Sequence, residues 1–438
     1  MHEYAIKRRQ AVQFVICILL FAFFVRVIAG MLYYNTFDTD WYKHWAIGLQ
    51  DGFFDCYARL SEEKYRLDYP PVYLLFLKAV GWLYQVLPVE SYAIYDMLLI
   101  KFFPILFDTL TAGLLYLCCR KYSEWIGVLA AGLWALNPSL IFNSAYWGQT
   151  DGMMMFFLLL AFYIVEQDRP ILGSIVYAVA CLTKLQCLYF APVLFLFLLR
   201  RDGLRKSLAC IGAAMATGIT AFIPFILGSW RLRGWQSLLT PFEVYFGGLG
   251  SYPYAALNTY NLYGIFNLNW IYDCRSLAFG TMDEKLGYAV GGLTLNHISL
   301  LFMLASLVLL VVVMLRSRGR ARLWMGCFLF MQCVFMLTTR MHERYQIVVL
   351  LFAMLIWSRL RDMRWLGIYT ALSLVSMVNQ FMLLVRNTTI NLKPAPFNEL
   401  IFPVQTFMSL LNLGIFLWCL FEVWRWAHNA PREEVENS

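Results

Sequence analysis

Residues 7–34 read KRRQAVQFVICILLFAFFVRVIAGMLYY. Basic residues at 7–9 precede an apolar run that extends from Ala11 to Tyr34. A membrane-spanning helix needs about 20 apolar residues, so this run can cross a bilayer and is too long for the apolar region of a cleavable signal peptide. Because Lys and Arg concentrate on the cytoplasmic side, we expect a first spanning helix with its N-terminus inside and no cleaved leader.

The composition extends this prediction to the whole chain. Of 438 residues, 61% are hydrophobic and 14% are charged, and the mean hydropathy is +0.61. Soluble proteins average about 45–50% apolar and about 25% charged residues. These values exclude a soluble enzyme, a disordered chain and a nucleic-acid-binding protein. The net charge of +8 fits the basic cytoplasmic loops of an all-α polytopic membrane protein.

Apolar runs and basic loops together predict about twelve spanning helices. Basic clusters at 120–121, 200–206, 316–322 and 359–364 mark the cytoplasmic loops. The expected spans are 11–34, 98–119, 125–145, 152–165, 170–183, 187–199, 207–229, 297–315, 323–338, 345–358, 365–385 and 402–424. Both termini then lie in the cytoplasm.

An even number of crossings must separate two cytoplasmic segments. The spans 11–34 and 98–119 already connect the N-terminus to the basic pair at 120–121. The apolar run 71–87 is therefore predicted to be an interfacial or re-entrant helix on the outer side. By the same count, 170–199 forms two short helices or one re-entrant pair.

The chain is predicted to be one membrane domain over 1–425, followed by a short cytoplasmic tail at 426–438. The outer loops 35–97 and 230–296 are long, aromatic and acidic-polar, whereas the inner loops are short and basic. The chemistry is therefore expected on the outer face.

Asp38 and Asp40 open the first outer loop, a few residues beyond the first predicted span. A carboxylate at the membrane surface beside aromatic side chains can remove the proton of an acceptor hydroxyl as a general base. A divalent cation held by the two acids is a further option. The alternative is a solvated loop start within an aromatic interface belt.

Asp68 and Tyr69 stand just before the apolar run at 71–87. They are predicted to line a sugar or acceptor site, and the alternative is that Asp68 caps the following helix. Lys101 and Asp108 lie two turns apart on one face of a span. Ionisable residues in spans usually face the bundle interior, so Asp108 is expected to be structural, whereas Lys101 could snorkel to the surface.

The turn at 143–151 joins two spans on the outer side and reads NSAYWGQTD. Trp147 can pack on the face of a sugar, while Gln149 and Asp151 bind hydroxyl groups. The alternative is a helix start at which Thr150 or Asp151 is the N-cap.

Basic residues in predicted outer loops are unusual, because Lys and Arg concentrate in the cytoplasmic loops of membrane proteins. Lys184 lies between two short apolar runs and predicts an anion pocket, with Gln186 in the sugar site; a snorkelling lysine is the alternative. Arg340, His342 and Arg344 form a dense cluster suited to a phosphate or diphosphate. A network of mutual salt bridges is the alternative for that cluster.

Together these motifs resemble those of the GT-C glycosyltransferases. The likeness rests on Asp38-x-Asp40 with His44-Trp45, Asp68-Tyr-Pro-Pro, Lys101 with Asp108, Trp147-Gly-Gln-x-Asp151, Lys184-x-Gln186 and His342-Glu-Arg-Tyr345, in that order. It extends from residue 1 to about residue 350, and the last two predicted spans are generic. The most similar proteins are bacterial relatives of the second mannosyltransferase of GPI-anchor synthesis, and the dolichyl-phosphate-glucose glucosyltransferases are more distant.

The resemblance implies a polytopic inverting transferase of the GT-C type, whose donor is a sugar on a polyprenyl phosphate in the outer leaflet. Asp38 matches the catalytic carboxylate of the first outer loop, and Asp40 matches a second acid. His342 and Arg344 match the loop that contacts the donor phosphate, where Arg340 and Lys184 are expected to add positive charge. Interfacial helices in the first outer loop are also a feature of the family.

The expected reaction transfers a hexose to a hydroxyl acceptor on the extracytoplasmic face, and mannose is the favoured hexose. The expected partners are the lipid-linked donor, a lipid-linked or polymeric glycan acceptor and membrane lipid, but no nucleic acid. No cofactor is expected to be required, with a divalent cation left open. The expected location is the cell membrane, or the ER membrane in a eukaryote. Alternatives are a flippase or exporter of lipid-linked sugars, and a ligase or polymerase that uses diphosphate-linked donors.

Overall fold

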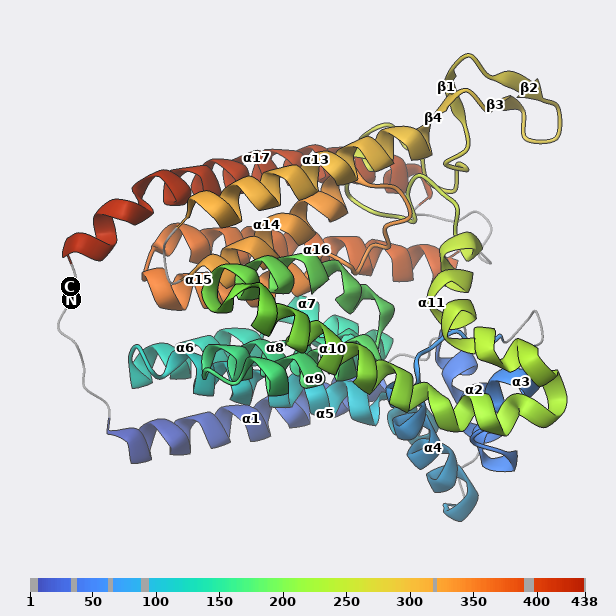
Figure 1. The fold of residues 1–438 in the computed structure, drawn as a ribbon, viewed down its shortest axis with the longest axis horizontal. Coiled ribbons are helices and arrows are strands. Elements are labelled where there is room, and N and C mark those ends of the chain that lie inside the picture. The colour runs from blue at the N-terminus through green and yellow to red at the C-terminus, as the bar shows by residue number, and fades with distance from the viewer. Residues whose placement is uncertain are drawn as a thin grey trace. The chain divides into compact units, whose positions relative to one another are not determined.

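A computed structural model describes residues 7–32, 38–61, 66–87, 94–317, 321–389 and 398–436. The chain divides into two compact units. Figure 1 shows the helices and strands that compose them. Unit 1 comprises 1–188 and 202–251, and unit 2 comprises 189–201 and 252–438. Helix α10 (Ala191–Arg233) contributes to both and is interrupted at Gly203, where φ is 79° and ψ is 171°. The single membrane domain over 1–425 stays a prediction.

The described part of unit 1 is built from helices. Its longer helices are α1 (Arg8–Met31), α5 (Ile94–Cys119), α6 (Glu124–Ala135), α8 (Asp151–Glu166), α9 (Pro170–Cys181) and the part of α10 that follows Gly203. The short α7 (Pro138–Ile141) and the π-helix η2 (Phe142–Trp147) connect α6 to α8. The other elements are α2 (Asp38–Asp51), α3 (Cys56–Arg59), α4 (Pro71–Val86), η4 (Gly234–Leu239) and α11 (Thr240–Ser251), and η3 (Leu185–Phe190) leads into α10.

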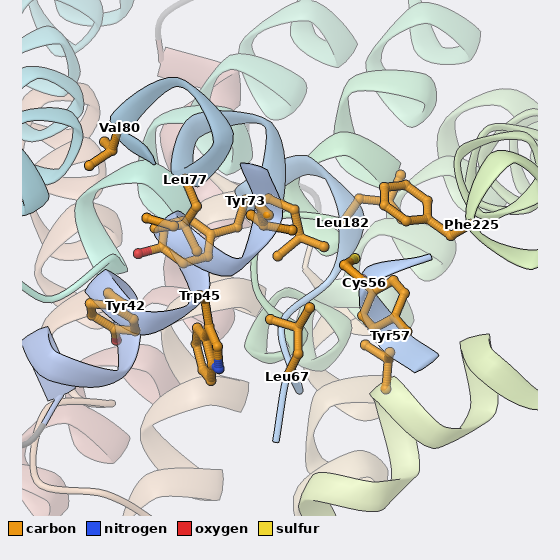
Figure 2. Packing of buried hydrophobic residues seen from close by; sticks show 14 of the residues in the cluster. Tyr42, Trp45, Cys56, Tyr57, Leu67, Tyr73, Leu77, Val80, Leu182 and Phe225 are labelled. Carbon is orange, nitrogen blue, oxygen red and sulfur yellow. The ribbon is translucent and has the colours of Figure 1, made fainter. Parts of the chain in front are cut away.

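A buried aromatic core anchors α2 and α4 within unit 1. Side chains of α2 and α4 pack with residues of α3 and α10 and with Leu182, which follows α9. Figure 2 shows this packing for Tyr42, Trp45, Tyr57, Tyr73, Leu77, Leu182 and Phe225. The backbones of α2 and α4 approach closely because Gly81 has no Cβ; one built there would lie 1.9 Å from the carbonyl oxygen of Ala46. This packing gives α2, and the acids at its start, a fixed position.

Unit 2 combines helices with two small antiparallel ribbons. The helices are α12 (Leu262–Ile265), α13 (Leu295–Arg316), α14 (Arg322–Leu337), α15 (Ile347–Leu360), α16 (Met363–Thr389) and α17 (Asn398–Glu436). Strand β1 (Ser276–Ala278) pairs with β4 (Leu293–Thr294), and β2 (Thr281–Asp283) pairs with β3 (Tyr288–Val290). Two buried side-chain amides hold the segment before α12 on the helices of unit 2. Asn412 donates to the carbonyl of Tyr260 at 2.7 Å, and Asn379 donates to the carbonyl of Asn258 at 2.6 Å.

The helices confirm an all-α polytopic membrane protein. Six stretches of the described residues are long and apolar enough to cross a membrane, or seven if the bent pair formed by α6 and the α7–η2 segment is one span. Over its described residues, each predicted span nevertheless overlaps a helix. Helices α8, α9, α14 and α15 are not among the six stretches because they are only 12–16 residues long. The total of about twelve crossings and the side on which each loop lies stay predictions.

Two predicted segments have a defined structure. The run at 71–87 forms α4, an apolar helix packed on α2, and its depth in a membrane stays a prediction. Helix α17 continues to Glu436, so the segment described as a tail is helical over most of its length.

Candidate active site

Asp38 is the first residue of α2, and two side-chain donors hold its carboxylate. Its Oδ2 accepts hydrogen bonds from Nε1 of Trp147 at 2.9 Å and from Nε2 of Gln149 at 2.8 Å. No hydrogen bond from the described residues reaches Oδ1. Two donors on one oxygen fix the orientation of the carboxylate and leave the other oxygen for a hydroxyl group.

Tyr42 fixes the orientation of the Gln149 amide. The Tyr42 hydroxyl donates to Oε1 of Gln149 at 3.4 Å and lies 3.0 Å from the Tyr69 hydroxyl. Because Oε1 accepts from Tyr42, the NH₂ group of Gln149 is the one directed at Asp38. Tyr42 was not among the predicted site residues; its spacing of one helical turn from Asp38 is the signal that could have identified it.

The segment that carries Trp147 and Gln149 has unusual backbone geometry. The π-helix η2 ends at Trp147, and Gly148 follows with φ 85° and ψ 29°. Single π-helical turns are rare and frequently occur at functional sites, and a left-handed residue costs little only when it is glycine. The reversal at Gly148 lets the residues on both sides of it reach the same carboxylate oxygen.

Asp151 and Lys184 form a buried ion pair. Their oxygen and nitrogen are 2.5 Å apart, and the side chains are 3% and 4% exposed. Asn143 donates to the second oxygen of Asp151 at 3.3 Å. The helix start weighed as an alternative is confirmed in position, because Thr150 is the N-cap of α8, although its side chain forms no capping hydrogen bond. The alternative for Lys184 is wrong, because its side chain is buried rather than snorkelling. The sugar and phosphate roles of the pair stay predictions.

Asp68 and Tyr69 lie between α3 and α4. Burial raises the pKa of the half-buried Asp68 to about 6, although its own backbone N–H and Arg66 act in the opposite direction. The N-cap of α4 is Pro70, without a side-chain hydrogen bond, so Asp68 does not cap that helix. Through its hydroxyl contact with Tyr42, Tyr69 joins the hydrogen-bonded group around Asp38.

Asp40 and Gln186 are placed differently from the residues around Asp38. Residues two apart on a helix are about 200° apart around its axis, so Asp38 and Asp40 leave α2 on different sides. Among the described residues, no three His, Cys, Asp or Glu side chains gather as metal ligands.

Gln186 lies in η3, and its buried Oε1 has no hydrogen-bond partner in the described part of the chain.

In unit 2, the loop between α14 and α15 carries the predicted phosphate-binding residues. The ring of His342 lies between those of Tyr252 and Tyr345, with centroid distances of 5.2 and 5.1 Å. The backbone of Leu257 forms a β-bridge with His342 and donates to the carbonyl of Met341 at 3.3 Å. The amides that hold the segment around Tyr260 on the helices therefore also support His342.

Both arginines of this loop have carboxylate partners. Arg340 donates from Nε to Asp273 at 2.6 Å and from Nη2 at 3.3 Å, and Arg344 donates to Glu343 at 2.8 Å. The salt bridges weighed as an alternative are therefore present, and phosphate binding stays a prediction. The sequence analysis did not predict the contact of Asp273 with Arg340, because the two residues are 67 positions apart and no local sequence pattern indicates that they pair.

The helices form an all-α polytopic membrane protein, which is consistent with the architecture of the GT-C glycosyltransferases. A model of the ALG6, ALG8 glycosyltransferase family matches residues 42–410 of the chain. The chain therefore belongs to this family. A comparison with curated proteins finds no match.

Family membership confirms that the protein is a membrane glycosyltransferase with a lipid-linked donor, and it leaves the flippase alternative unsupported. The family is that of the dolichyl-linked glucosyltransferases, the more distant of the two likenesses seen in the motifs. The closer likeness to mannosyltransferase relatives stays a prediction. The match begins at residue 42, so Asp38 and Asp40 lie just outside it.

Proposed function

We propose that the chain transfers a hexose from a polyprenyl-phosphate donor to a hydroxyl of a glycan on the extracytoplasmic face, with inversion at the anomeric carbon. The observation that carries this proposal is the geometry of Asp38, whose Oδ2 has two donors while Oδ1 has none among the described residues. The lipid-linked donor is supported by the family. The acceptor and its side of the membrane rest on the predicted topology.

In the proposed reaction, Asp38 is the general base. The acceptor oxygen attacks the anomeric carbon and gives its proton to Asp38, and the bond from that carbon to the phosphate oxygen breaks. The leaving group is polyprenyl phosphate, which takes the bonding electrons. Trp147 and Gln149 keep the carboxylate oriented, which matters because proximity and alignment supply a large part of such rate enhancements.

The departing phosphate needs positive charge or hydrogen-bond donors. We assign this role first to His342 and Arg344, because a guanidinium group matches the geometry of phosphate oxygens. Arg340 and Lys184 are secondary choices, because the resemblance matches His342 and Arg344 to the loop that contacts the donor phosphate. Each of the three cations Arg340, Lys184 and Arg344 has a buried carboxylate partner. Asp40 is retained as an accessory acid only.

The transferred sugar is a hexose, for which the motifs and the family match favour different candidates. The motifs predict mannose, whereas the family match favours glucose. Six residues are proposed to contact sugar or acceptor: Asp68, Tyr69, Trp147, Gln149, Asp151 and Gln186. The unsatisfied Oε1 of Gln186 supports this role, because a buried carbonyl without a donor is costly and a sugar hydroxyl would supply one.

The test is transfer of labelled hexose by purified protein, with membrane extract as the acceptor pool. Polyprenyl-phosphate glucose and polyprenyl-phosphate mannose are offered as donors in separate reactions. Each reaction is run with and without a metal chelator, and the chelator is expected to leave the rate of transfer unchanged. Asp38→Asn should lower transfer by about 10²–10⁴-fold, the usual contribution of a general base. Asp51→Asn, at the exposed far end of the same helix, should be unaffected.

Near-normal transfer by folded Asp38→Asn would contradict the assignment of the base. Transfer only from diphosphate-linked donors would instead favour the ligase or polymerase. Use of one monophosphate donor alone would identify the sugar.

A further inference from the structure

Lys101 connects the ends of two helices in unit 1. It lies on α5, fully buried, and its Nζ donates to the carbonyls of Gly30 at 3.0 Å and Tyr146 at 2.8 Å. Gly30 is in the last turn of α1, and Tyr146 is in the last turn of η2. Carbonyls at a helix C-terminus lack partners within the helix and form the negative end of its dipole, so an ammonium group stabilises both ends.

The stem of the same lysine packs against the turn that follows η2. A Cβ built on Gly148 would lie 2.9 Å from Cγ and 3.3 Å from Cε of Lys101. Lys101 therefore contacts Tyr146 through its charge and Gly148 through its methylene groups. The two donors to Asp38, Trp147 and Gln149, are the immediate neighbours of these contacts.

A second side chain of α5 holds the beginning of η2. Asp108, two turns beyond Lys101, accepts from the Ser144 hydroxyl at 2.8 Å and pairs with Arg26 of α1 at 2.8 Å. Helix α5 thus contacts both α1 and η2 at two positions two turns apart. At one position the contact is made by the ammonium group of Lys101, and at the other by the carboxylate of Asp108. With both ends fixed, η2 has little freedom to move its C-terminal residues.

We propose that Lys101 is a positioning residue for Asp38, acting through the carbonyl of Tyr146 and the turn at Gly148. This inference rests on the proposed function, in which Asp38 is the general base. Without Lys101, the turn loses its charge contact and its packing, and Trp147 and Gln149 no longer converge on one oxygen. A displacement of about 1 Å in such a site can lower a rate by about 10²-fold.

The first experiment tests the position of the turn and needs no substrate. Backbone hydrogen exchange is compared between wild type and Lys101→Met, which keeps the apolar stem and removes the ammonium. Exchange over 142–150 should be at least about tenfold faster in the variant, since the C-terminal end of η2 loses the ammonium group that holds it against local opening. Lys121→Met is the matched control, because Lys121 lies beyond α5 and pairs with Glu166 away from η2. Unchanged exchange over 142–150 in Lys101→Met would overturn the proposal.

The second experiment separates positioning from general destabilisation. In Lys101→Met, kcat should fall about 10–100-fold while KM for the donor changes less than about twofold, and the acid limb of the pH–rate profile should move to higher pH. Lys101→Arg, which keeps a cation and its donors, should recover part of the rate. A purely structural loss would reduce the folded fraction and leave the pH profile and the kcat of the folded protein unchanged, which would contradict the proposal.

The outcomes remain separable from those of the proposed function. If Asp38→Asn retains activity, the general base is misassigned, while the exchange result still decides whether Lys101 positions the turn. If Asp38→Asn is inactive and Lys101→Met behaves as wild type, the inference about Lys101 fails alone. Should Lys101→Met not fold, Lys101→Gln, which keeps one donor in the bundle, is measured in the same way.

Discussion

At the scale of single residues, the proposed chemistry depends on how the two oxygens of the Asp38 carboxylate are used. Oδ2 of Asp38 is occupied by Trp147 and Gln149, and the Gln149 amide is itself oriented by Tyr42. A carboxylate held in this way cannot rotate to exchange its oxygens without losing both bonds. In the proposed reaction, Oδ1 therefore faces the acceptor hydroxyl in one direction.

Trp147→Phe tests this arrangement because it removes one donor and keeps an aromatic ring. Hydrogen bonds to charged groups contribute about 1.5–3 kcal/mol, so kcat should fall about 10–100-fold. The acid limb of the pH–rate profile should move to higher pH, since a carboxylate with one donor fewer binds its proton more tightly. Steady-state rates between pH 5 and 8 measure both effects. Trp82→Phe, an exposed tryptophan of α4, is the control, and an unshifted profile in Trp147→Phe would contradict the role.

Asp68 predicts a pH dependence of stability. Its pKa rises from an ordinary 3.8 to about 6 on folding, so the folded protein binds an extra proton between these values. Stability should therefore fall as the pH rises from about 4 to about 6, by at most about 1.4 kcal/mol per pH unit. Melting temperatures of wild type and Asp68→Asn in detergent between pH 4 and 7 measure this. The fall should be absent in Asp68→Asn and retained in Asp51→Asn; parallel curves for wild type and Asp68→Asn would refute the assignment.

At the scale of elements, η2 joins the membrane helices to the candidate site. Its beginning is held by Asp108 through Ser144, and its end by Lys101 through Tyr146. The left-handed conformation of Gly148 then turns the chain toward α8. A short irregular helix between rigid neighbours can thus present Trp147 and Gln149 in a fixed geometry.

Gly148→Ala is expected to disturb this element in two ways. A left-handed alanine costs about 1–2 kcal/mol, and its Cβ would lie 2.9 Å from Cγ of Lys101. The variant should therefore be less stable and transfer sugar at least about tenfold more slowly. Gly218→Ala on α10 is the control, because nothing lies within 4 Å of a Cβ there and alanine favours helix. Thermal melting and initial rates compare the two, and equal behaviour would contradict the role of Gly148.

At the scale of the whole molecule, the predicted topology places the loop between α12 and α13 outside. Of the eleven cysteines, only Cys17 and Cys274 are exposed, and Cys17 lies on the apolar helix α1. A membrane-impermeant maleimide should therefore modify Cys274 in sealed right-side-out vesicles. Cys274→Ser should abolish the labelling. Labelling confined to inside-out vesicles would reverse the topology.

The sequence by itself determined the helices and most of the polar side chains of the candidate site. A chain in lipid must satisfy its backbone hydrogen bonds internally, so apolar length alone locates helices such as α1 and α13. The short motifs likewise selected Asp38, Trp147 and Gln149 as residues of interest. These properties are local, and a local pattern is enough to reveal them.

Only the tertiary structure decided which of these groups meet. Trp147 and Gln149 reach Asp38 across 109 and 111 residues, and Asp273 reaches Arg340 across 67. Lys101 contacts two helix ends instead of extending to the surface, because carbonyls at those ends lack partners within their own helices. Such pairings depend on how helices pack, which is set by shape and burial along the whole chain rather than by any one segment.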